Sequence, residues 1–131
     1  MYKKKKISVV VPAYNEEVQI FKVIDTMPGF VDFIVITDDK STDRTVKVIQ
    51  NCQKANPKII LIKHKANEGV GGAIATGYKW SRDNKIDIAV VMAGDAQMDP
   101  LDLKDIINPV INDIADYSKA NRLVTEDSYS K

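Results

Sequence analysis

Short apolar runs rich in β-branched residues recur along this chain, and they constrain its fold more than any other feature. Four such runs occupy residues 7–11, 33–36, 59–62 and 86–92. Their continuous apolar character is typical of strands that are buried on both faces. The segments between them carry apolar residues at helical spacing, and strands that alternate with helices predict a parallel sheet with right-handed crossovers. The sequence therefore predicts an α/β fold with three layers, α/β/α, and a mostly parallel, Rossmann-like sheet.

Three helices are predicted between these strands. The first lies behind Asn15, which we expect to cap it, with the two glutamates that follow in the first turn. The second follows residues 41–43 and ends before residues 56–57, and the third runs from about residue 69 to residue 83. The residues of the third helix expected to face the core are Val70, Ala73, Ile74 and Gly77.

Beyond Pro100 the pattern is helical at first and then disappears. Apolar residues at helical spacing occupy 103–114, and because Pro109 suits the first turn of a helix, we expect a break at Asn108 and a second short helix. Residues 123–131 have few apolar side chains and no periodicity. We expect this tail to be loose, or cut from something longer.

Length and charge limit the class of protein. A chain of 131 residues, 44% of them hydrophobic, predicts one domain over residues 1–131. Its 19 basic and 18 acidic side chains nearly cancel, so no overall field attracts nucleic acid. The one cysteine, Cys52, cannot form an internal disulfide, the apolar runs are too short to span a membrane, and no signal-peptide pattern precedes them. These features favour a cytoplasmic protein.

Polar segments follow the four predicted strands. In an open parallel sheet, ligands bind beyond the carboxyl ends of the strands, so these segments are the informative ones. They occupy residues 12–17, 38–43, 65–72 and 94–100. Taken singly, each also has an ordinary interpretation as a loop exit, a turn or a helix cap.

The second and third segments carry residues suited to a nucleotide. Asp38 and Asp39 are common turn residues, but an Asp at a strand end can also accept an N–H of uracil or guanine. The glycines within residues 69–72 let the backbone approach a ligand closely, and the backbone amides there lie at a predicted helix N-terminus. Both features suit phosphate. A lone glycine cluster is weak evidence.

The fourth segment carries oxygen donors. Asp95, Gln97 and Asp99 lie within five residues, a spacing that suits a hard cation bridged to phosphate oxygens. Asp99 is better explained as a helix cap before Pro100. For Asp95 that explanation is weaker, because it follows a strand that should end in the crevice of the sheet.

Taken in this order, the four segments resemble the inverting glycosyltransferases with the GT-A fold, particularly the polyprenyl-phosphate sugar transferases. The resemblance covers residues 7–122. A fifth motif, at residues 115–122, looks like the strand on which such enzymes place a phosphate-binding arginine. Single motifs of this kind occur by chance, but five in order are specific. They read Val-Pro-Ala-Tyr-Asn-Glu at 11–16, Asp-Asp-x-Ser-x-Asp at 38–43, Asn-x-Gly-x-Gly-Gly-Ala at 67–73, Asp-x-Gln-x-Asp-Pro at 95–100 and Ala-Asp-Tyr-Ser-Lys-Ala-Asn-Arg at 115–122.

The resemblance implies a nucleoside site in the first three motifs. Pro12, Tyr14 and Glu16 would line the nucleoside pocket. Asp39 would read the base, and Asn67 would contact the nucleotide sugar. All five residues follow predicted strands, where a parallel sheet binds ligands.

The resemblance also implies a phosphate and metal site. Asp95 and Gln97 would hold Mg²⁺ or Mn²⁺ at the diphosphate. Gly72 and Arg122 would contact the nucleotide sugar at the same phosphates. Where the family usually has an Asp two residues before the metal-binding Asp, this chain has Ala93. One ligand is therefore missing, and water or a phosphate oxygen must fill its place.

The implied activity is transfer of a sugar, with inversion, from a UDP- or GDP-sugar to a polyprenyl phosphate or a saccharide. In such enzymes, the carboxylate that acts as general base lies downstream of the metal motif. Glu126 and Asp127 are the last two acids of the sequence, and their aperiodic surroundings favour a solvated tail, so the base is unassigned. We expect a truncated domain whose missing C-terminal part would supply the acceptor site and any peripheral contact with the cytoplasmic face of a membrane.

Other nucleotide-binding α/β proteins fit less well. A sugar-nucleotide pyrophosphorylase has a glycine-rich, arginine-bearing loop after its first strand, and a dehydrogenase has G-x-G-x-x-G there, where this chain has Pro-Ala-Tyr-Asn-Glu. A response-regulator receiver places its paired acids after the first strand, not the second. The alternative that stays open is a sugar-nucleotide-binding or scaffolding domain without catalysis, which Ala93 favours.

Overall fold

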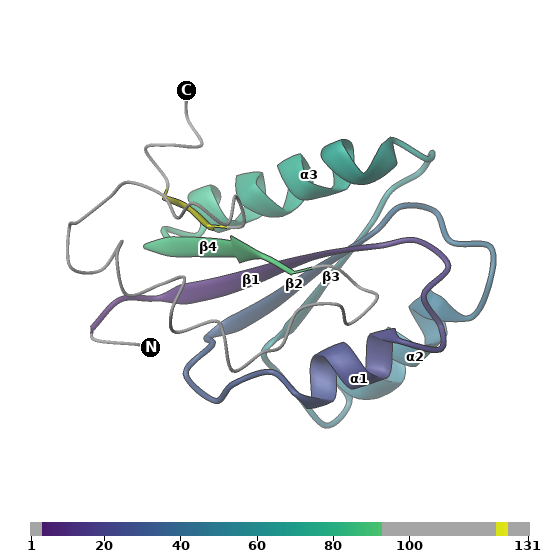
Figure 1. Ribbon diagram of the computed structural model, residues 1–131, viewed down its shortest axis with the longest axis horizontal. Helices are drawn as coiled ribbons and strands as arrows, with labels where there is room; N and C mark the ends of the chain where they lie inside the picture. Colours follow the sequence, from purple (N-terminus) through teal and green to yellow (C-terminus); the bar gives the residue numbers. More distant parts are fainter. Residues whose placement is uncertain (1–3, 93–122, 126–131) are drawn as a thin grey trace.

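The computed structural model describes residues 4–92 and 123–125 (Figure 1). Its elements run in the order β1 (Ile7–Ala13), α1 (Ile20–Asp25), β2 (Phe33–Asp38), α2 (Thr45–Gln53), β3 (Ile59–Lys63), α3 (Gly69–Asp83), β4 (Ile88–Val91) and β5 (Leu123–Thr125). The predicted alternation of strands and helices is confirmed, and α3 has its predicted bounds. The helices predicted after Pro100 lie outside the described residues.

The strands form one sheet in the order β3-β2-β1-β4-β5. The pairs among β1, β2, β3 and β4 are parallel, and β5 runs antiparallel to β4, with Leu123 opposite Val90. The sheet is thus mostly parallel, as predicted. The expectation of a loose tail is wrong for Leu123–Thr125, because these residues pair with a strand whose outer backbone groups need partners.

Helices cover both faces of the sheet and give the three predicted layers. Figure 1 shows α3 along one face and α1 with α2 along the other. Side chains alternate accordingly along β1: Val9 and Val11 join the core that includes α1 and α2, whereas Val10 packs with Tyr78 of α3. All three valines are fully buried. Burial on both faces explains why the strands read as continuous apolar runs.

The face that α3 turns to the sheet differs from the predicted one. The prediction places Val70 in the core, but this residue is 67% exposed. It lies in the first turn of α3, and burial begins one turn further on, at Ala73. Near the other end, the Oγ of Ser81 lies 2.7 Å from the Oγ of Ser8 in β1. The buried face is made by Ala73, Gly77, Tyr78 and Ser81.

Gly77 allows α3 to approach β1 closely. A Cβ atom at position 77 would lie 2.3 Å from Cγ1 of Val10, a side chain that is fully buried. Gly77→Ala should therefore destabilise the protein by roughly 1–3 kcal/mol through overpacking. Gly71→Ala is the matched control: nothing lies within 4 Å of its Cβ position, so it should raise stability by about 0.5–1 kcal/mol. Urea unfolding measures both variants, and wild-type stability of Gly77→Ala would contradict this account of the packing.

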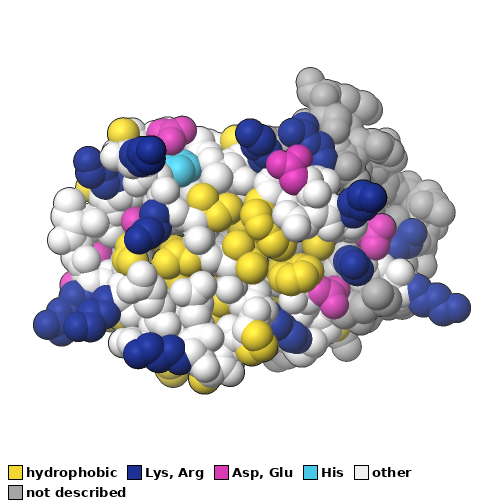
Figure 2. Space-filling model, turned by 180° about the vertical axis from the view of Figure 1, so that it is seen from behind, with side chains coloured by type: hydrophobic (Ala, Val, Ile, Leu, Met, Phe, Trp, Pro, Cys, Tyr) yellow, Lys and Arg dark blue, Asp and Glu magenta, His cyan; other side chains and the backbone are white. Residues whose placement is uncertain are grey.

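The surface of the described residues is mixed in charge. Basic side chains on the face shown in Figure 2 are scattered around a central apolar patch, with acidic side chains among them. Among its described residues, this face therefore has no continuous single-sign surface that would attract a polyanion. No helix in the described part of the chain is long and apolar enough to cross a membrane.

Candidate functional site

Two loops meet at the carboxyl end of the sheet. Because β1 and β2 are neighbouring parallel strands, the loops that follow them, residues 14–19 and 39–44, leave the sheet side by side. The Oγ of Ser41 accepts a hydrogen bond from the amide of Asn15 (2.9 Å). The side-chain oxygen of Asn15 in turn accepts one from the amide of Thr42 (2.8 Å). These reciprocal bonds join the two loops.

This arrangement corrects the predicted cap of the first helix. Asn15 has a φ of 52° and directs its side-chain oxygen to the neighbouring loop rather than to α1. α1 begins at Ile20, and its first turn holds no acidic residue. Glu16 belongs to the loop, where its amide donates to Oγ1 of Thr45 (2.9 Å). An Asn side chain can satisfy a loop as well as a helix end, and only the tertiary structure decides between them.

Two acids on either side of Asp39 accept hydrogen bonds from residues two or three positions further along the chain. Asp38 accepts hydrogen bonds from the amide (3.1 Å) and the hydroxyl (2.6 Å) of Ser41. Asp43 accepts one from the amide of Thr45 (2.9 Å) and one from its hydroxyl, and so satisfies the start of α2. Burial raises the pKa of Asp43, but the hydrogen bonds, led by those from Thr45, outweigh it and hold the pKa below its ordinary value.

Asp39 joins the second loop to the start of α3. Its side chain is 5% exposed, and Oδ1 accepts hydrogen bonds from the amide of Glu68 (2.7 Å) and from Nδ1 of His64 (2.9 Å). Oδ2 accepts a third, from the amide of Gly69 (2.8 Å). Burial raises the pKa of Asp39, but these hydrogen bonds outweigh it and hold the pKa below its ordinary value. Asp39 is therefore an ionised carboxylate at the positive end of α3.

The loop before α3 brings more predicted residues to this point. Nδ2 of Asn67 donates to the backbone oxygen of Asp39 (3.2 Å). Gly69 has a φ of 83°, which glycine adopts without strain, and its amide is the one that reaches Oδ2 of Asp39. Gly72 lies in the first turn of α3, where an added Cβ would lie only 2.8 Å from Cβ of Glu68. Gly69 and Gly72 of the glycine cluster are thus explained by the backbone conformation and the close packing beside Asp39.

His64 is a residue of this site that the sequence analysis did not predict. It follows β3 directly, and its side chain is 6% exposed. Nε2 lies 2.8 Å from Oγ1 of Thr76 in α3, and Nδ1 lies 3.5 Å from Oε2 of Glu68. Its position in the sequence could have identified it as a site residue, because the only histidine of the chain stands directly at a strand end.

The predicted site residues fall into two groups. Those that the structure places at the carboxyl end of the sheet or at the start of α3 are Pro12, Tyr14, Glu16, Asp39, Asn67 and Gly72. Those outside the described residues are Asp95, Gln97 and Arg122. Within the described ranges, no group of three His, Cys, Asp or Glu side chains could hold a metal ion. The metal prediction therefore rests on the sequence.

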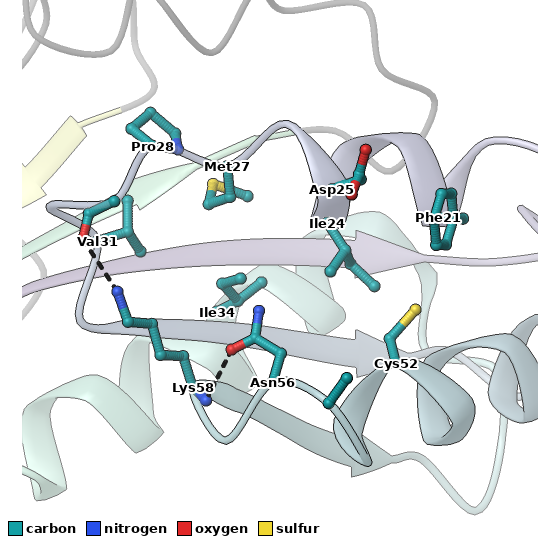
Figure 3. Close-up of a pocket in the computed structure, with 12 residues that line it drawn as sticks. Phe21, Ile24, Asp25, Met27, Pro28, Val31, Ile34, Cys52, Asn56 and Lys58 are labelled. Carbon is teal, nitrogen blue, oxygen red and sulfur yellow. Dashed lines mark hydrogen bonds between the residues drawn. The ribbon is translucent and has the colours of Figure 1, made fainter.

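A hollow of about 340 Å³ lies at the other end of the sheet, near the start of β2 and between α1 and α2 (Figure 3). Nζ of Lys58 donates to the backbone oxygen of Gly29 across it (3.0 Å). Burial, with the charge of Asp25, raises the pKa of the Cys52 thiol, so this lining residue is a poor nucleophile. None of the predicted site residues lines the hollow, which is therefore separate from the site around Asp39.

The two lowered carboxyl pKa values predict loss of stability in acid. A carboxyl group whose pKa is lower in the folded than in the unfolded protein stabilises the fold at pH values above its unfolded pKa. This stabilisation is lost as the pH falls through the pKa of the folded protein. The ordinary value for Asp39 and Asp43 is 3.8. Urea unfolding should therefore show stability decreasing below about pH 4. The decrease should be smaller in Asp43→Asn, where one group no longer titrates, and an unchanged pH dependence there would contradict the prediction.

Comparison with known proteins assigns the chain to a family. A family model described as Glycosyl transferase family 2 matches residues 8–130. The chain belongs to this family. The match continues past residue 122, where the resemblance in the sequence was expected to end, and so includes most of the tail.

Named glycosyltransferases are among its relatives. The UDP-N-acetylglucosamine–dolichyl-phosphate N-acetylglucosaminyltransferase of Methanococcus voltae is 37% identical over 132 residues, which cover 91% of this chain and 53% of the relative. The human dolichyl-phosphate beta-glucosyltransferase is 38% identical over 98 residues, which cover 65% of this chain and 30% of the relative. The chain thus spans about half, or less, of the length of these relatives.

Solved structures confirm the expected GT-A fold. Mycobacterium tuberculosis glucosyl-3-phosphoglycerate synthase, in complex with Mn²⁺, uridine diphosphate and glucosyl-3-phosphoglycerate, is 27% identical with a TM-score of 0.65, over 82% of this chain and 40% of that one. Residues 1–349 of S. aureus TarS are 22% identical with a TM-score of 0.68, over 85% of this chain and 34% of that one. At that identity, the second likeness shows the fold alone.

Proposed function

We propose that this chain binds a nucleoside diphosphate sugar and forms the donor-binding part of an inverting glycosyltransferase whose acceptor is a polyprenyl phosphate. The observation that carries the proposal is that Asp39 joins the end of β1 to the start of α3. Its amide donates to the backbone oxygen of Ala13, and its carboxylate accepts from the amides of Glu68 and Gly69. The relatives' names support a dolichyl-phosphate acceptor, and one of them names a UDP-sugar donor. A UDP-sugar is therefore our first candidate, and a GDP-sugar the second.

The start of α3 offers backbone amides to the diphosphate. The first amides of a helix have no partner within it and favour anions. Asp39 binds the amides of Glu68 and Gly69, so the next ones, at Val70 and Gly71, are placed to bind phosphate oxygens. Nothing lies within 4 Å of the Cβ position of Gly71, which leaves room for a phosphate against the backbone.

Asp39 is the candidate for base recognition. Its Oδ1 accepts two hydrogen bonds from the protein and its Oδ2 one, so Oδ2 can accept another from N3–H of uracil or the ring N–H of guanine. Tyr14 is 46% exposed beyond the end of β1 and offers its ring to the nucleoside. The half-buried Pro12 and Glu16 would complete the lining of the nucleoside pocket.

The motif at residues 95–99 is the candidate metal site. Asp95 and Gln97 offer the oxygen ligands that Mg²⁺ and Mn²⁺ prefer, and the M. tuberculosis relative binds Mn²⁺ together with uridine diphosphate. When bound, the metal would stabilise negative charge on the leaving diphosphate. Arg122 would bind the same phosphates and share that role.

A phosphate acceptor would also reduce the need for the unassigned general base. In an inverting transfer the acceptor oxygen bonds to the anomeric carbon while the bond from that carbon to the diphosphate breaks. A phosphate monoester has a second pKa of about 6, so its oxygen is largely deprotonated at neutral pH. A saccharide hydroxyl would instead require a base. A polyprenyl phosphate acceptor would place the enzyme at a membrane surface, and we propose the cytoplasmic face.

Calorimetric titration with UDP, GDP and their sugars, in the presence of Mg²⁺ or Mn²⁺, tests the donor site. We expect saturable binding of a nucleoside diphosphate and much weaker binding of uridine or guanosine, which lack the phosphates. Absence of binding by both diphosphates would refute the proposal. A sugar-nucleotide-binding domain without catalysis stays the alternative, favoured by Ala93, and transfer of labelled sugar into polyprenyl phosphate by the chain would exclude it.

A further inference from the structure

His64 links three parts of the site and has no role in the function proposed above. It lies between the end of β3, the loop after β2 and the second turn of α3. Both ring nitrogens have partners: Nδ1 lies 2.9 Å from Oδ1 of Asp39 and Nε2 lies 2.8 Å from Oγ1 of Thr76. With its side chain 6% exposed, the ring is fixed at both ends in a nearly buried position.

The hydrogen-bond partners determine where the ring carries its proton. The carboxylate of Asp39 is ionised and can only accept, so Nδ1 must be protonated and donate. Oγ1 of Thr76 lies within reach of both Nε2 and the backbone oxygen of Gly72 (3.0 Å). Whichever of these two bonds the Thr76 proton makes, the Nδ1–H bond to Asp39 is unchanged.

The same bonds determine which oxygen of Asp39 stays available. His64 and the amide of Glu68 both donate to Oδ1, which occupies its two lone pairs. Oδ2 accepts only from the amide of Gly69 among the hydrogen bonds to the carboxylate described above. Loss of the His64 bond would free a lone pair on Oδ1 and remove one of three bonds that hold the carboxylate in its orientation.

We propose that His64 is a positioning residue for base recognition: through Nδ1–H it holds Asp39 with Oδ2 turned to the N–H of the nucleotide base, while Thr76 holds the ring. The proposal rests on the proposed donor site, since it assigns to His64 the orientation of the carboxylate that reads the base. It differs from a purely structural role, because it requires one specific ring nitrogen rather than the volume of the ring.

Two amide substitutions separate the ring nitrogens. In His64→Asn the side-chain nitrogen takes the place of Nδ1 and can still donate to Asp39, whereas in His64→Gln it takes the place of Nε2 and can reach only Thr76. Both variants lose the ring, and they differ from each other by a single methylene group. We expect His64→Asn to keep UDP or GDP affinity within about threefold of wild type and His64→Gln to lose about tenfold or more, the effect of one hydrogen bond to a charged group. Equal losses in the two variants, no loss in either, or the opposite order would overturn the proposal.

The single histidine allows a direct spectroscopic test. Long-range ¹H–¹⁵N correlation of the imidazole in ¹⁵N-labelled protein should show Nδ1 protonated, and saturation with UDP or GDP should shift this resonance, because Oδ2 of Asp39 gains a second donor. A bare Nδ1, or an imidazole spectrum unchanged at saturation, would overturn the positioning role. Failure of the donor site is distinguishable, because then wild-type protein binds neither nucleotide in calorimetry, and the positioning role fails with it.

Discussion

Asp39→Asn should lower both the stability of the protein and its affinity for nucleotide. The substitution keeps the size of the side chain but replaces one acceptor oxygen by an NH₂ group, which must then face an amide of Glu68 or Gly69, or Nδ1–H of His64. Because hydrogen bonds to charged groups contribute about 1.5–3 kcal/mol, we expect a stability loss of about 2–3 kcal/mol in urea unfolding. Calorimetry should show UDP or GDP affinity reduced by roughly 10–100-fold.

Asp43→Asn provides the matched control for this prediction. Asp43 is also a carboxylate bonded at the start of a helix, α2, so its loss should cost stability. It is not assigned to the nucleotide site, and nucleotide affinity should stay near the wild-type value. Wild-type affinity in a folded Asp39→Asn protein would remove Asp39 from base recognition.

A modified nucleotide separates base recognition from an indirect effect through α3. UDP methylated at N3 of uracil lacks the N–H that Asp39 would accept, so wild-type protein should bind it as weakly as Asp39→Asn binds UDP. If both changes remove the same hydrogen bond, combining them should cost little more than either alone. Additive losses would show that Asp39 acts only by holding the start of α3.

The backbone of this fold could be predicted because each strand and helix has its own local signal. Apolar runs such as residues 33–36 identify strands buried on both faces, and the turn signals between them leave little freedom in the order of elements. α3 matches its predicted bounds because a glycine with positive φ begins it and an apolar period follows. Residues 123–125 gave no such signal, since their strand depends on a partner distant in sequence, β4.

Side-chain partners could not be predicted in the same way. Asn15 and His64 both bond to loops that are distant in sequence, and sequence spacing contains no information about that contact. Asp38 and Asp39 are adjacent and chemically identical, yet the first binds its own loop and the second binds α3. The sequence placed a candidate carboxylate at the strand end, and the structure adds that this carboxylate is bonded to a histidine.

Removal of divalent metal should weaken nucleotide binding, because the metal at Asp95 and Gln97 would offset repulsion between the diphosphate and the carboxylates around it. Coupling between two ligands is typically about 5–150-fold, and we expect a loss in that range when EDTA is added to a UDP or GDP titration. The coupling must be reciprocal, so the nucleotide should raise Mn²⁺ affinity by the same factor. Uridine or guanosine serves as the control, since nucleosides without phosphates should bind equally with and without metal.

Ala93→Asp tests whether the metal occupies this motif. The substitution adds the carboxylate that the family usually has two residues before the metal-binding Asp, so Mn²⁺ should bind more tightly in the absence of nucleotide. The coupling between Mn²⁺ binding and nucleotide binding should then become smaller. The added carboxylate supplies negative charge to the metal that only the diphosphate supplies in the natural chain. Asp95→Asn should act in the opposite sense and abolish the effect of EDTA. Nucleotide affinity that is equal with and without metal in the natural chain would instead show that the amides of α3 bind the diphosphate without a cation.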